Sequence, residues 1–124
     1  MKSEINIAPK NALLLIMDLE HGVIPEKIGG HLVVATSSCI VIGTMSEIDG
    51  ETNLVLTDKA QSQLSDPNML LVYTGTLDTP RKRVDVCNVQ LDCVLSVEVE
   101  SKKCHIELWA NDKKEPNKIC IRIQ

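Results

Sequence analysis

The sequence predicts an all-β protein, a mainly antiparallel sandwich or flattened barrel of about seven to nine strands with at most one or two short helical turns. Polar and apolar residues alternate over much of the second half of the chain, which is typical of half-buried strands. β-Branched residues are abundant, with 12 Ile and 12 Val, whereas Phe is absent and Trp and Tyr occur once each. Aliphatic side chains that pack well on a pleated sheet must therefore form most of the core. A length of 124 residues predicts a single domain over residues 1–124.

The first part of the chain has the weakest pattern. Ile5 and Ile7 alternate with polar neighbours and indicate a strand. The apolar run 13–17 fits a buried strand or a short helix equally well, because the run is too short for its period to be read. Another strand is expected over 31–35, after the flexible pair Gly29-Gly30.

Residues 39–57 are predicted to form a β-hairpin. Asp49-Gly50 is a favoured two-residue turn, because a type I′ turn needs positive φ at both central positions. This turn would pair Met45 with Leu54. Both faces of such a hairpin are largely apolar, so we expect its strands inside a sheet and not at an edge.

Three carboxylates, those of Glu47, Asp49 and Glu51, surround this turn. A hard-cation site would need about five or more converging oxygen ligands, and the spacing does not match a calcium-binding loop. We interpret the cluster as the solvated tip of a bend. The sequence predicts no metal site and no cofactor.

Farther along, 58–65 is compatible with one helical turn capped by Asp58, and a strand is expected over 69–77 between two turn signals. The clearest alternation follows, and it predicts a three-stranded meander over 89–99, 104–110 and 119–123. The phase of the alternation changes near Cys87-Asn88. A β-bulge or a short break between two strands would explain that change.

Composition excludes several classes of function. The net charge is −4, which argues against general nucleic-acid binding, and the scarcity of aromatic residues removes the stacking platforms of single-strand binders. No apolar run is long enough to span a membrane, and no export signal is visible. The five cysteines show no C-x-x-C pairing, so we expect free thiols in the cytoplasm.

The candidates for catalysis are few. Asp18 and His21 form a carboxylate–histidine pair of the kind that can act as a general base with its orienting partner. Cys39 is a candidate nucleophile if His21 or His31 lies beside it, although a buried free thiol is the plainer interpretation. Cys104 and His105 point to opposite faces of a strand and cannot both bind zinc.

A binding surface has two possible sources. The alternation places Trp109 on the polar face of its strand with His105 and Glu107, where an exposed aromatic would suit an interface, unless a second layer such as residues 5–17 covers it. The second source is basic turns between strands. In a meander, two of these turns would share one end of the molecule and gather the side chains of Arg81, Lys82, Arg83, Lys113 and Lys114.

Taken together, these features predict a small, acidic, cytoplasmic, non-catalytic binding module. Its expected partner is a protein or a second copy of itself in a homodimer, and neither nucleic acid nor membrane. A stoichiometric inhibitor or an immunity-type protein fits this description by analogy of size and charge. The alternative is a small-ligand or enzymatic pocket that uses Asp18, His21 and either Cys39 or His31.

Overall fold

The protein is an almost all-β sandwich. The computed structural model describes residues 2–58 and 67–124, and within them ten strands form two five-stranded sheets. The 3₁₀ turn η1 (Lys10–Ala12) is the single helical element of the described residues. The predicted fold class is confirmed, with one strand more than the expected range. A helical turn was expected over 58–65, and all of this segment except residue 58 lies outside the described residues.

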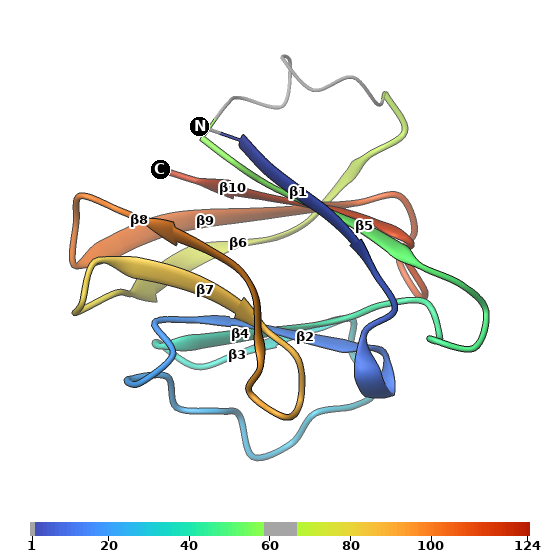
Figure 1. Cartoon of the computed structure of the whole chain (residues 1–124), viewed down its shortest axis with the longest axis horizontal. Helices are drawn as coiled ribbons and strands as arrows, with labels where there is room; N and C mark the ends of the chain where they lie inside the picture. The colour runs from blue at the N-terminus through green and yellow to red at the C-terminus, as the bar shows by residue number, and fades with distance from the viewer. Residues whose placement is uncertain (1, 59–66) are drawn as a thin grey trace.

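The two sheets form two layers (Figure 1). In order across it, the first sheet contains β1 (Lys2–Ile7), β5 (Thr52–Thr57), β10 (Lys118–Ile123), β9 (Lys103–Ala110) and β6 (Leu70–Asp78). The second contains β3 (Val33–Ala35), β4 (Cys39–Gly43), β2 (Leu13–Met17), β7 (Arg83–Cys87) and β8 (Cys93–Glu98). All neighbouring strands run antiparallel except β5 and β10, which are parallel. The ambiguous run 13–17 is therefore a strand.

The main core lies between the two sheets and is aliphatic, as the composition requires. The alternation of β9 places one complete face in this core, where Cys104, Ile106, Leu108 and Ala110 are all buried. The opposing sheet contributes fully buried side chains from β2, β4 and β7, namely Leu14, Ile16, Ile40, Ile42, Val84 and Val86. Each fully buried side chain of this size contributes about 1.5–3 kcal/mol by leaving water.

The predicted hairpin over 39–57 is wrong. β4 and β5 belong to different sheets, and residues 44–51 cross from one layer to the other. Gly50 has the positive φ that the turn would need, at +137°, but Asp49 does not, so no type I′ turn forms. The connection is instead fixed by the hydrogen bond from the Met45 N–H to the Pro116 carbonyl, at 2.8 Å. Both strands are interior strands, as their apolar faces suggested.

The predicted meander is also wrong in its connectivity. β8 pairs with β7 in the second sheet, whereas β9 pairs with β10 and β6 in the first, so residues 99–102 cross between layers. The strand expected over 89–99 begins only at Cys93. Residues 88–92 form the turn of the β7–β8 hairpin, where Leu91 has a φ of +64°. The phase change near Cys87 has both of the expected causes: the register shifts between Val86 and Cys87, and residues 88–92 then separate two strands.

The outer face of the second sheet carries a smaller apolar cluster. It consists of Leu15, Met17, Cys39, Val41 and Cys87. The long connection 18–32 begins against this face, where Leu19 packs on the cluster, and runs along the lower side of the sheet in Figure 1. No helix within 2–58 or 67–124 is long and apolar enough to cross a membrane.

Candidate functional site

The outer face of the first sheet brings together the three residues that the alternation placed on one side of β9. His105, Glu107 and Trp109 all lie on this face, because their even-numbered neighbours fill the core. Strand pairing adds Arg122 of β10 opposite Glu107 and Leu71 of β6 opposite Trp109. We call these five residues the tryptophan face.

The polar part of the tryptophan face is a connected network. Glu107 Oε1 accepts hydrogen bonds from Trp109 Nε1 at 3.2 Å and from Arg122 Nη1 at 3.1 Å. The hydrogen bond from Arg122 lowers the pKa of Glu107 and keeps the carboxylate charged. At the edge of the network, His105 Nε2 lies 2.9 Å from Thr74 Oγ1. The network holds the indole in a fixed orientation.

Trp109 is half-buried, whereas the sequence suggested either an exposed side chain or one covered by a second layer. The proposed covering layer is absent, because residues 2–7 form β1 in the same sheet and 13–17 form β2 in the other. The apolar neighbours of Trp109 across the strands are Cys120, which is 4% exposed, and Leu71, which is 49% exposed. Burial raises the pKa of the Cys120 thiol to about 11, so this thiol stays protonated at neutral pH.

The expected common end for the basic turns is not formed. Asp78 pairs with Lys103, and the Thr79 N–H donates to the Lys102 carbonyl at 2.8 Å, so the 79–82 and 99–102 turns lie together. The 111–117 turn lies at the opposite end of β9, because Ala110 pairs with Leu70. The prediction failed because it assumed a meander. Lys113 and Lys114 are exposed there and lie far from Arg81, Lys82 and Arg83.

Carboxylates accompany the basic side chains of the 79–83 region. Arg81 Nη1 lies 3.0 Å from Glu20 Oε2, and Arg83 Nη2 lies 3.1 Å from Asp85 Oδ1. Lys82 is exposed and has a φ of +58°. These ion pairs reduce the local positive charge that a basic patch would offer to an acidic partner.

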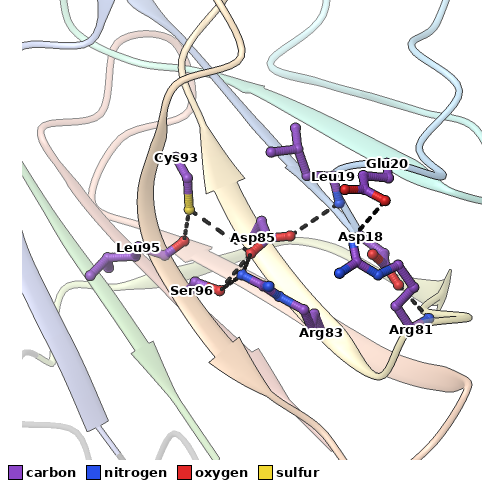
Figure 2. Close-up of polar contacts among 9 residues, drawn as sticks. All are labelled: Asp18, Leu19, Glu20, Arg81, Arg83, Asp85, Cys93, Leu95 and Ser96. Atoms are coloured by element: carbon purple, nitrogen blue, oxygen red, sulfur yellow. Dashed lines mark hydrogen bonds and ion pairs between the residues drawn. The ribbon is translucent and has the colours of Figure 1, made fainter.

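Asp85 is the centre of a second network, which sequence reasoning missed (Figure 2). Its carboxylate is 2% exposed and lies on the outer face of the second sheet. It accepts hydrogen bonds from the Leu19 N–H at 3.1 Å, from Ser96 Oγ at 2.5 Å and from Arg83. Cys93 Sγ lies 3.9 Å away. The alternating polar position of Asp85 gave no sign that connection 18–32 would cover it.

Asp18 is also buried, and its carboxylate accepts a hydrogen bond from the backbone. Oδ2 accepts a hydrogen bond from the Arg81 N–H at 2.6 Å, while Oδ1 is buried without a hydrogen-bond partner (Figure 2). His21 lies in the same turn, with its N–H bonded to the Asp18 carbonyl, but its side chain is exposed. Within the described residues no side-chain hydrogen bond joins the two groups.

The remaining catalytic candidates, His31 and Cys39, are not joined by a side-chain hydrogen bond in the part of the chain that the structure describes. His31 is exposed, whereas Cys39 is buried and faces the small apolar cluster. Burial raises the pKa of Cys39 to about 11, which keeps the thiol protonated at neutral pH. Among residues 2–58 and 67–124, no group of three or more His, Cys, Asp or Glu side chains is placed to hold a metal ion.

Comparison with known proteins gives one informative likeness. No protein-family model and no curated protein sequence matches the chain. Among solved structures, the crystal structure of ComJ from Bacillus subtilis is similar, with a TM-score of 0.65 and 8% sequence identity. The match covers 99% of this chain and 93% of the ComJ chain. ComJ is described as an inhibitor of the DNA degrading activity of NucA. At this identity the likeness shows the fold.

Proposed function

We propose that the protein is a non-catalytic binding protein of the inhibitor type, which acts by covering a surface of a partner enzyme. The observation that carries the proposal is the likeness of nearly the whole chain to ComJ, which is described as an inhibitor. The likeness is one of fold, so the transfer of function is an analogy. The alternative enzymatic pocket has no support from side-chain chemistry, because no side-chain hydrogen bond joins any two of the described residues Asp18, His21, His31 and Cys39. Both histidines are exposed, whereas Cys39 is buried.

The tryptophan face is the proposed contact surface. Tryptophan and arginine are enriched among the side chains that carry binding energy in protein interfaces, and both lie side by side on this face. Trp109 is held by Glu107 before any partner arrives, so little conformational entropy is lost on binding. The exposed side chain of Leu71 extends the apolar area at the edge strand.

A nuclease is the first class of enzyme to test as the partner. Enzymes that bind nucleic acids present cationic surfaces, because they must neutralise phosphates. This chain carries a net charge of −4, which would accelerate its encounter with such a surface. The exposed lysines Lys82, Lys113 and Lys114 are proposed to contribute only at the periphery.

Self-association through β6, the edge strand that borders the tryptophan face, is the second candidate. β6 is an edge strand of the first sheet, and its first two residues, Leu70 and Leu71, are 43% and 49% exposed. An edge strand with apolar side chains can pair with a second copy of itself. Sedimentation equilibrium distinguishes the cases: a dimer that Trp109→Glu dissociates supports a homodimer, and a monomeric wild type removes it without affecting the inhibitor proposal.

The test of the inhibitor proposal uses purified components. Enzymes captured by the immobilised chain from the organism that encodes it, nucleases first, are purified and titrated with the chain. We expect one of them to lose activity at a 1:1 ratio. Trp109→Glu should weaken that inhibition strongly. Val23→Glu is the matched control, because Val23 is 64% exposed in connection 18–32 on the other side of the sandwich, and it should inhibit normally. If no captured enzyme is inhibited by the pure chain, the proposal fails.

A further inference from the structure

Two cysteines face each other across the β7–β8 hairpin. Cys87, the last residue of β7, pairs with Cys93, the first residue of β8, and both are free thiols. Both lie on the outer face of the second sheet, because Met17 of that face pairs with Asp85, two residues before Cys87. This thiol pair has no part in the proposed inhibitor function.

The backbone at this pair is suited to a disulfide. Cys87 and Cys93 are direct partners across the two strands, immediately after a register irregularity between Val86 and Cys87. Residues directly opposite each other in an antiparallel pair have Cα atoms about 4.5–5.5 Å apart. Disulfides span Cα separations of about 4.4–6.8 Å, so a bond needs little backbone movement.

Access to the two thiols is unequal. Cys93 is exposed, whereas Cys87, Cys39, Cys104 and Cys120 are buried. Cys93 Sγ donates to the Leu95 carbonyl at 3.2 Å and lies near the Asp85 carboxylate (Figure 2). A soluble reagent therefore reaches Cys93 first, with Cys87 directly behind it. This is the arrangement of an attacking thiol and a resolving thiol.

We propose that Cys87 and Cys93 form a reversible dithiol–disulfide site that exchanges with small-molecule disulfides such as oxidised glutathione. The Cys93 thiolate attacks one sulfur of the reagent, its S–S bond breaks, and one glutathione thiolate leaves. The Cys87 thiolate then attacks Cys93 Sγ, and the second glutathione leaves. The protein loses two electrons and two protons, and one oxidised glutathione becomes two reduced glutathione molecules.

The surroundings of the pair make this exchange slow at neutral pH. Burial and the Asp85 carboxylate raise the pKa of Cys93, although Arg83 opposes them. The pKa of Cys87 is raised to about 12, mainly by burial. The charges of Cys93 and Asp85, the hydrogen bond with Cys93 and the charge of Cys39 add to this effect. Because only thiolates attack, the exchange rate should rise with pH, by about tenfold per pH unit while the attacking thiol is mainly protonated.

The experiment incubates the folded protein with oxidised glutathione at alkaline pH and follows intact mass, free thiols and linked peptides. We expect wild type to lose two thiols, to retain no glutathione and to yield a Cys87–Cys93 cross-linked peptide that dithiothreitol releases. Cys87→Ser should stop at a glutathione adduct on Cys93, and Cys93→Ser should give neither product. Cys120→Ser is the control and should behave as wild type.

Circular dichroism of each variant shows that it is folded before the thiols are compared. A stable glutathione adduct on wild-type Cys93, five remaining free thiols, or a cross-link between other cysteines would overturn the proposal. Because the assay needs no partner enzyme, its result is independent of whether the inhibitor function holds.

Discussion

The backbone N–H of Leu19 donates a hydrogen bond to Asp85 Oδ2 at 3.1 Å, although the two residues lie 66 positions apart in the chain. The bond links the start of connection 18–32 to the middle of β7. A second contact of the same kind lies nearby, where the Asp18 carboxylate accepts a hydrogen bond from the Arg81 backbone N–H. Two buried carboxylates thus hold two segments of irregular backbone against the sandwich.

Replacement of Asp85 should therefore destabilise the fold. In Asp85→Ala the Leu19 N–H and the Ser96 hydroxyl lose their acceptor, and we expect the free energy of unfolding to fall by about 1–3 kcal/mol. Urea unfolding measures the change. Glu20→Gln is the control, since its ion pair with Arg81 is solvent-exposed and should contribute less than about 1 kcal/mol. Equal effects of the two changes would contradict the assigned role of Asp85.

Gly22 allows connection 18–32 to pass close to β2. A Cβ atom at this position would lie 2.8 Å from Met17 Cβ, closer than such atoms pack. We expect Gly22→Ala to lower stability by about 1–3 kcal/mol, as overpacking does. Gly43→Ala is the matched control. A Cβ atom at Gly43 would make only ordinary contacts, at 3.7 Å or more. The thermal unfolding temperature of Gly43→Ala should therefore change little or rise.

Glu107 should contribute a pH-dependent part of the stability. Its pKa in the folded state is lowered below 4.5, first by the Arg122 hydrogen bond. Its contribution is therefore complete above pH 4.5 and is lost as the pH falls through the folded pKa. The difference in free energy of unfolding between wild type and Glu107→Gln, measured by urea unfolding, should therefore shrink as the pH falls from 4.5 through the folded pKa of Glu107. In an Arg122→Gln background the same comparison should lose most of its pH dependence; an unchanged dependence would show that Arg122 is not the cause of the lowered pKa.

Two isoleucines test the assignment of inside and outside. Ile106 is 0% exposed between the sheets, whereas Ile48 is 91% exposed in the 44–51 connection. Ile106→Ala should cost about 2–5 kcal/mol, because it removes buried methyl groups and leaves a cavity. Ile48→Ala should change stability by no more than about 0.5 kcal/mol. Chemical unfolding of both variants measures the contrast, and a large loss for Ile48→Ala would disprove the exposed position.

Local alternation was enough to predict the fold class and the contents of one face. The pattern from Cys104 to Ala110 depends only on the two-residue period of a strand, which needs no knowledge of neighbours. For the same reason His105, Glu107 and Trp109 were correctly placed on one side. The position of Arg122 beside Glu107 depends on the register between β10 and β9, which the alternation does not specify.

Connectivity could not be predicted because a turn signal does not show which sheet the next strand joins. Asp49-Gly50 favours a hairpin locally, yet β4 already has β3 and β2 as its two neighbours, so the chain continues into the other layer. Burial of Asp85 was missed for a related reason. A polar residue at an alternating position indicates solvent, whereas the segment that covers Asp85 comes from residues much earlier in the chain.

β10 lies between β5 and β9 in the first sheet, although it is the last strand of the described chain. During synthesis on the ribosome, β1 can pair with β5, and β6 with β9, but these two halves stay unjoined until β10 is inserted. Until then each half exposes an open edge and an apolar surface, which are the features that make nascent chains prone to aggregate. Pairing of β10 with β5 and β9 is therefore the step that removes these open edges from the interior of the first sheet.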